Sequence, residues 1–141
     1  MNSTCVVSLT LPLPPRGCSP NLDSHRHWRL RSRGRGEYRM AAKLHLMQGA
    51  RGIKAGKVRI SCAFWCGKVL PRDDFYRPKD EANGIASLKA MVDGFVDAGL
   101  VPDDDAKHVT WGSCQIHGIK ESGRKSCVEV TIEIVEPEGL E

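Results

Sequence analysis

The alternation of apolar and polar residues predicts several short β-strands. A period of two places one side chain in a core and the next in solvent. Such alternation occurs in residues 6–13, 58–64, 108–119 and 128–135. The most regular stretch is the last, VEVTIEIV. Residues 70–77 are either a further short strand or an extended loop, and residues 136–141 are expected to form a frayed tail.

Two other stretches have a helical pattern. In residues 84–98 the apolar side chains recur on one stripe, with Asn83 as the expected N-cap and Gly99 as the expected stop. The basic residues 27–47 are interrupted by two glycines, so a helix is expected there only from about Glu37. Strands interleaved with two helices predict a single α+β domain whose helices pack on one sheet.

Charge is divided unequally along the chain. Residues 1–60 contain 12 Lys or Arg against 2 Asp or Glu, whereas residues 61–141 contain 9 against 15. A basic block of this kind is typical of an anion-binding surface, and the phosphate backbone of nucleic acid is the commonest such anion. A solvated charged surface is the alternative. The candidate DNA-binding residues are Arg26, Arg29, Arg31, Arg33, Arg35, Arg39 and Lys43.

Trp28 stands among these arginines and has two interpretations. An exposed indole would stack on a base, whereas a buried one would close the core, and we expect the second.

Six cysteines are few for a disulfide scaffold, so reduced thiols and a cytoplasmic location are expected. The first residues lack the basic region and cleavage site of a signal peptide. No apolar run approaches the roughly 20 residues of a membrane helix, so no membrane partner is expected. A zinc site remains the alternative use of the thiols. Its candidate ligands are Cys62, Cys66, His108, Cys114 and His117.

Carboxylates surround the predicted helix 84–98. They are Asp80 and Glu81 before it, Asp93 on it, and Asp103, Asp104 and Asp105 after it. Adjacent carboxylates repel one another unless a cation or a basic partner screens them, and oxygen ligands suit Mg²⁺ or Mn²⁺. Lys89 either forms an ordinary surface ion pair with Asp93, four residues on, or lies over a metal site.

Several short motifs follow one another along the chain in a fixed order. They are Leu-Pro-Leu-Pro-Pro at 11–15, Ser-Pro-Asn at 19–21, His-Trp-Arg at 27–29, Tyr-Arg at 38–39, Asp-x-x-Asn at 80–83, Ser-Leu-Lys-Ala at 87–90, Asp-Gly at 93–94 and Pro-Asp-Asp at 102–104. In this order they resemble the RusA-type Holliday junction resolvases, and in particular the phage and prophage members. The resemblance covers about residues 8–134, and its specificity lies in the ordered set rather than in any one motif.

This resemblance implies a fold, an activity and partners. The implied fold is a RusA-like α+β domain over residues 1–141, with a mixed sheet and two main helices. Members of the family act in DNA recombination and repair. They are homodimers that resolve four-way DNA junctions by paired symmetric nicks. They use Mg²⁺ (Mn²⁺ is possible) held by Asp residues, with no organic cofactor.

The resemblance also assigns roles by position. Catalysis falls to Asp80, Lys89 and Asp104, and the metal to Asp80, Asp103 and Asp104, where the matching pair within residues 103–105 is ambiguous by one residue. Asn83 matches the Asn of the family motif and has a supporting role, and Glu81, Asp93 or Asp105 could compensate for a missing carboxylate. The second Asp of the family motif falls on Ala82, which has no ligand atom. Two functions therefore stay open, a Mg²⁺-dependent junction endonuclease and a non-catalytic DNA-binding relative.

Overall fold

The computed structural model describes residues 5–20, 28–68, 74–120 and 125–138. Its elements are β1 (Val6–Leu11), the 3₁₀ turn η1 (Arg16–Cys18), α1 (Trp28–Gly49), β2 (Ala55–Cys66), α2 (Glu81–Ser87), α3 (Lys89–Asp97), β3 (Val109–Gly118) and β4 (Cys127–Pro137). Within these described residues, no helix combines the length and the apolar character that crossing a membrane requires.

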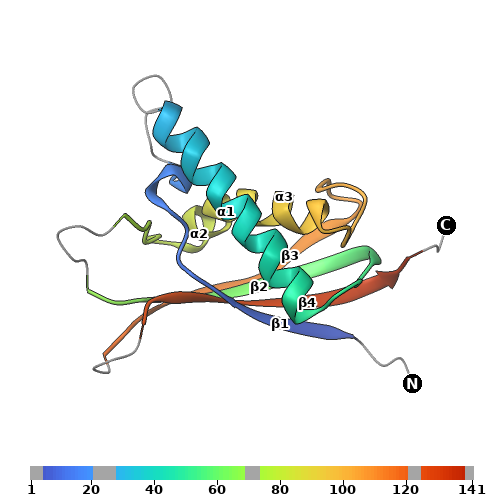
Figure 1. The fold of residues 1–141 in the computed structure, drawn as a ribbon. Helices are drawn as coiled ribbons and strands as arrows, with labels where there is room; N and C mark the ends of the chain where they lie inside the picture. The colour runs from blue at the N-terminus through green and yellow to red at the C-terminus, as the bar shows by residue number, and fades with distance from the viewer. Residues whose placement is uncertain (1–4, 21–27, 69–73, 121–124, 139–141) are drawn as a thin grey trace.

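The four strands form one mixed sheet in the order β1-β4-β2-β3. Strand β4 pairs antiparallel with both β1 and β2, whereas β2 and β3 are parallel and are connected through α2 and α3. All three helices lie on the same face of the sheet (Figure 1). The prediction of a single α+β domain is therefore confirmed, and so is the mixed sheet. Strand β4 continues to Pro137, two residues beyond the predicted strand end.

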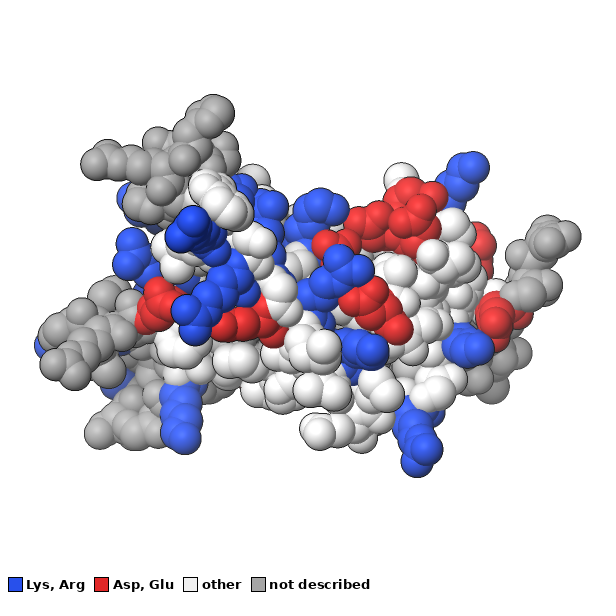
Figure 2. Space-filling model, turned by 45° about the horizontal axis from the view of Figure 1, so that its top comes forward, with Lys and Arg blue, Asp and Glu red and all other residues white. Residues whose placement is uncertain are grey.

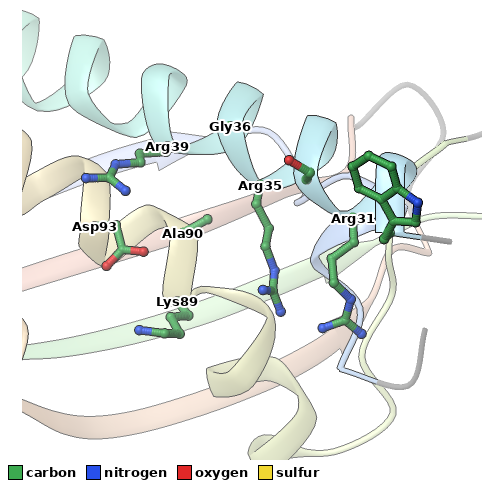
Figure 3. Close-up of a pocket in the computed structure, with 9 residues that line it drawn as sticks. Arg31, Arg35, Gly36, Arg39, Lys89, Ala90 and Asp93 are labelled. Carbon is green, nitrogen blue, oxygen red and sulfur yellow. The ribbon is translucent and has the colours of Figure 1, made fainter. Parts of the chain in front are cut away.

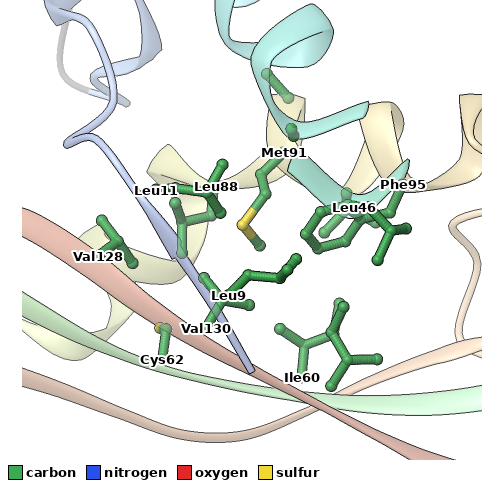
Figure 4. Close-up of a cluster of buried hydrophobic side chains, with 14 of the residues drawn as sticks. Leu9, Leu11, Leu46, Ile60, Cys62, Leu88, Met91, Phe95, Val128 and Val130 are labelled. Atoms are coloured by element: carbon green, nitrogen blue, oxygen red, sulfur yellow. The ribbon is translucent and has the colours of Figure 1, made fainter. Parts of the chain in front are cut away.

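The core lies between the sheet and the helices. Alternate residues of β2 are buried, among them Val58, Ile60 and Phe64, as the period of two predicts. Met91 and Phe95 of α3 point at this face of the sheet (Figure 4). Residues 70–77 contribute no strand in their described part, where Phe75 makes an isolated bridge with Pro15.

Helix α1 is longer than the sequence predicted. It begins at Trp28 and runs through Gly34 and Gly36 without a break, so the expected start at Glu37 is wrong. Gly34 is buried against Gly17, where an added Cβ would lie 3.0 Å from the Gly17 Cα. This glycine is explained by a close approach of two backbones and does not break the helix. All residues from 28 to 49 consequently belong to one regular helix.

The predicted helix 84–98 is divided at the buried Leu88 into α2 and α3. Its N-cap is Asp80, whose Oδ1 accepts the Asn83 backbone N–H at 2.9 Å. The prediction of Asn83 as the cap is wrong because the helix begins three residues earlier than expected. At the other end the segment stops at Gly99, as predicted, with φ at +90°.

Candidate functional site

Two neighbouring hollows of about 410 and 460 Å³ lie between α1 and the α2–α3 segment. Arg31, Arg35 and Lys89 line both hollows, and we call the combined feature the arginine groove. Arg31 and Arg35 point from α1 into the space beside Lys89 (Figure 3). On this helical side of the molecule, Lys and Arg side chains gather next to Asp and Glu side chains (Figure 2). Both signs of charge therefore meet at one site.

The arginines of the arginine groove come from one stripe of α1. Residues four apart share a helix face, which aligns Arg31, Arg35 and Arg39. Arg39 is held by Asp97 of α3, with Nε–Oδ2 at 2.5 Å and Nη2–Oδ1 at 2.8 Å. Hydrogen bonds in this pair raise the pKa of Arg39 and lower that of Asp97. Arg39 thus ties α1 to α3 at one end of the groove.

The other predicted DNA-binding residues lie elsewhere. Arg33 faces away from the groove, pairs with Glu37 at 3.0 Å and lines a separate hollow. The Arg29 guanidinium lies over the ring of Trp28, 5.4 Å from its centroid. Lys43 lies near Asp97, and its charge lowers the pKa of that carboxyl group. The effect of Lys43 is smaller than that of Arg39. Arg26 lies outside the described residues.

At the groove, Asp104 is bound to Lys89. The Lys89 Nζ donates to the Asp104 Oδ2 at 3.1 Å. This hydrogen bond raises the pKa of Lys89 and is the main cause of the lowered pKa of Asp104. Asp103 supports the arrangement, because its Oδ1 accepts the backbone N–H of Asp104 at 2.7 Å. Lys89 therefore stays protonated, and Asp104 stays ionised, over a wide pH range.

Asp93 also belongs to this cluster. It is half-buried in the groove, and burial raises the pKa of its carboxyl group, against the lowering effect of Lys89. Asp104 lies close enough to raise that pKa further. The pKa of Asp93 is therefore raised, whereas that of its neighbour Asp104 is lowered. The sequence had given Asp93 only a supporting role.

Asp105 lies outside the cluster of Lys89, Asp93 and Asp104. Its Oδ1 is 2.5 Å from the Nδ1 of His108, and its backbone carbonyl accepts the N–H groups of His108 and Val109. These contacts close the turn that leads into β3. The three adjacent aspartates therefore have different partners: Asp103 bonds its neighbour's backbone, Asp104 bonds Lys89, and Asp105 bonds His108.

Asp80 is separated from the cluster by the whole of α2. Its two carboxylate oxygens accept from Asn83, one from the backbone N–H and one from Nδ2 at 3.2 Å. The structure does not bring it together with Asp103 and Asp104. Across the described ranges, no three Asp, Glu, His or Cys side chains converge on one point. The role of Asp80 as a metal ligand stays a prediction.

The chemistry of the donors at the groove fits a hard cation. Mg²⁺ is commonly held by one or two carboxylates, with water and phosphate oxygens completing its shell. Asp93 and Asp104 supply carboxylates at one place, and Lys89 is their present counter-charge. Of the three metal ligands expected from the sequence, Asp104 lies beside Asp93 and Asp103 bonds the Asp104 backbone, and the three-residue metal set stays a prediction.

Two tryptophans line the arginine groove. Trp28 lines the first hollow and is 60% exposed, so the prediction that it is buried is wrong. Its place in the first turn of α1 puts it at the edge of the molecule rather than over the sheet. Trp111 of β3 lines the second hollow beside Asp104. Trp111 was not predicted as a site residue, since nothing in its local sequence pattern distinguishes it from a core residue.

The central thiols interact with each other. Cys62 of β2 and Cys114 of β3 are register partners, and both are buried. A hydrogen bond between them raises the pKa of Cys62 and lowers that of Cys114. The zinc alternative gains no ligand set within the part of the chain that the structure describes.

No protein-family model matches the chain, and no curated protein matches its sequence. The likeness to RusA-type resolvases therefore rests on the ordered motifs alone.

Proposed function

We propose that the protein is a divalent-metal-dependent endonuclease that resolves four-way DNA junctions. One observation carries this proposal: the arginines of α1 face Lys89 and the Asp93–Asp104 pair across one groove. A row of cations binds a phosphate backbone, and carboxylates at the same place can hold the metal ion that assists its hydrolysis. The ordered motifs of the sequence support the same activity independently of this geometry.

In this mechanism Arg31 and Arg35 bind phosphates without reading base sequence. Protonated Lys89 exchanges its bond with Asp104 for one with the scissile phosphate, where it stabilises the developing negative charge. Asp104 and Asp93 would hold Mg²⁺ or Mn²⁺, which when bound polarises both water and phosphate. The family pattern adds Asp80 and Asp103 to this set.

Paired symmetric nicks require two related active sites, so the proposal includes a homodimer on the two-fold junction. It also includes a cytoplasmic location and a role in DNA recombination and repair. Gel filtration with light scattering tests the dimer separately from the chemistry.

The decisive experiment incubates the purified protein with a synthetic four-way junction, with and without Mg²⁺. We expect two symmetric nicks with Mg²⁺ or Mn²⁺ and none in EDTA. A linear duplex that contains the sequence of one arm is the matched substrate and should stay intact. An intact junction under all metal conditions would refute the endonuclease.

A second candidate function is DNA binding without catalysis. It is favoured by Ala82, whose side chain has no ligand atom, and by the described residues, among which no three Asp, Glu, His or Cys side chains form a metal-binding group. This function predicts junction binding that weakens steeply with salt and no cleavage with either metal. The same incubation, followed by a gel-shift measurement, separates the two functions.

A further inference from the structure

We infer that Trp28 stacks on an unpaired base of a DNA strand whose phosphates lie in the arginine groove. This inference rests on the proposed function of the groove as a DNA site, and it names the substrate as DNA with unpaired bases. A fully paired duplex has no unpaired base on which Trp28 could stack.

The indole ring of Trp28 is exposed to solvent. Trp28 is 60% exposed, the largest value among the exposed large hydrophobic side chains of the described residues. Burying an indole is normally favourable, and a tryptophan left this accessible in a folded chain commonly marks a binding surface. Among the described residues, Trp28 belongs neither to the core nor to the side chains packed against it, so packing there does not explain its presence.

Trp28 lies beside cationic side chains. Trp28, Arg31 and Arg35 are spaced by three and four residues, so they share one face of α1 and line the same hollow. From residue 28 to residue 35 the helix rises about 10 Å, a length comparable with one or two nucleotides of a strand. A base on the ring therefore leaves the adjoining phosphates within reach of the arginines.

The indole ring of Trp28 is held in one orientation by its neighbour Arg29. The Arg29 guanidinium lies over Trp28 at 5.4 Å from the ring centroid. This cation–π contact holds the indole before any ligand arrives, and it lowers the entropy lost on stacking. Aromatic platforms beside positive grooves are the usual means by which proteins bind single-stranded nucleic acid.

An apolar protein partner fits this site less well. Such a partner would cover Trp28 but would also bury the guanidinium of Arg35 in the same hollow, and burying a charged group that gains no counter-charge from the partner is costly. A nucleotide supplies both an aromatic face and an anion. Bases within a duplex are stacked on their neighbours, so only a branch point, an end or a single strand offers a free face.

The test compares Trp28→Ala and Trp28→Phe with wild type. The probes are a single-stranded oligonucleotide containing 2-aminopurine, a four-way junction with unpaired nucleotides at the branch, and a duplex. Since base stacking contributes about 1–3 kcal/mol, we expect Trp28→Ala to bind the two unpaired probes about tenfold more weakly, with no change for the duplex. Trp28→Phe should restore most of this affinity.

Two readouts separate stacking from other causes. The slope of log affinity against log salt should be the same for Trp28→Ala as for wild type, because no phosphate contact is removed. Leu44→Ala, at another exposed apolar position of α1, is the matched control and should bind like wild type. Thermal unfolding verifies that each variant is folded.

Several results would overturn the inference. They are unchanged binding by Trp28→Ala, an equal loss for duplex and unpaired probes, or no rescue by phenylalanine. If wild type binds the junction but never cuts it, the endonuclease proposal fails while the stacking inference is still decided by the affinities. If wild type binds no DNA, both fail.

Discussion

The chain has two acidic regions, and the structure uses them differently. Before α2, both oxygens of Asp80 bond Asn83, and the carboxylate caps a helix. After α3, Asp104 bonds Lys89 and lies near Asp93 beside the arginines of α1. The sequence treats both regions as parts of one metal motif, whereas the structure places only the second at the groove.

The difference shows that the neighbours of a carboxylate decide its chemistry. A helix N-terminus offers unpaired N–H groups, so an Asp at that position is satisfied locally. Asp104 instead meets a lysine and a second carboxylate, and its loop brings it to them across α3. The same residue type therefore stabilises a helix in one place and is available to a ligand in the other.

The largest expected effect separates the two regions by activity. Asp104→Asn should lower Mg²⁺-dependent junction cleavage by at least about 100-fold and leave junction binding intact, because it removes a proposed ligand but no cation. Asp80→Asn keeps a good N-cap, so any loss it causes reflects a direct role in cleavage. Single-turnover cleavage rates measure both. If Asp80→Asn loses as much as Asp104→Asn, the contrast between the two regions is wrong.

The next effect concerns the cations that face only the second region. Arg35→Ala should weaken DNA binding and lower the salt slope by about 1, since one phosphate contact is lost. Arg33→Ala removes a cation from the same helix but from another face, where it pairs with Glu37. Fluorescence anisotropy over a salt series measures both variants. If Arg35→Ala and Arg33→Ala have equal salt slopes, the arginine groove is not the phosphate-binding site.

A smaller effect tests the capping role of Asp80. Asp80→Ala should lower the free energy of unfolding by about 1 kcal/mol, because an orphan N–H at the start of α2 loses its acceptor. Asp80→Asn should lower it much less, since asparagine caps as well as aspartate. Lys79→Ala, at the exposed neighbouring position, is the control. Urea unfolding gives the three values, and an unchanged midpoint for Asp80→Ala would mean that the cap contributes nothing.

The smallest effect is the pH dependence of stability. Lys89 lowers the pKa of Asp104 below its usual 3.8, and Arg39 does the same for Asp97. A lowered pKa in the folded state adds stability above pH 3.8, which is lost as the pH falls through the folded value. The side chains of Asp97 and Asp104 are 32% and 33% exposed, so solvent screening keeps the change small. Lys89→Gln should flatten the stability profile between pH 4 and pH 2, measured by thermal unfolding.

Much of the fold follows from the sequence because alternation and helical spacing are local signals. Local sequence alone predicts the strands of residues 58–64 and 128–135 and the helix stop at Gly99. The start of α1 was missed because Gly34 is required by the approach of Gly17, and that approach is visible only in three dimensions.

The candidate site was predicted in its parts and missed in its arrangement. Lys89 and Asp104 were identified, but their contact depends on how the loop after α3 returns to the helix. The pairing of Arg39 with Asp97 joins residues 58 apart and depends on the crossing of α1 and α3. At that crossing an added Cβ on Gly94 would lie 3.0 Å from the Ala42 Cβ. Neither contact has a local sequence signal.

The order of the strands has a consequence for synthesis. Among the strands of the described residues, β1 pairs only with β4, and Val6 lies opposite Glu133. At ribosomal rates the first strand therefore waits roughly ten seconds for its partner, with its edge open to other chains. The nascent protein cannot close its sheet until β4 has left the exit tunnel, so chaperones that cover unpaired edges should increase its yield.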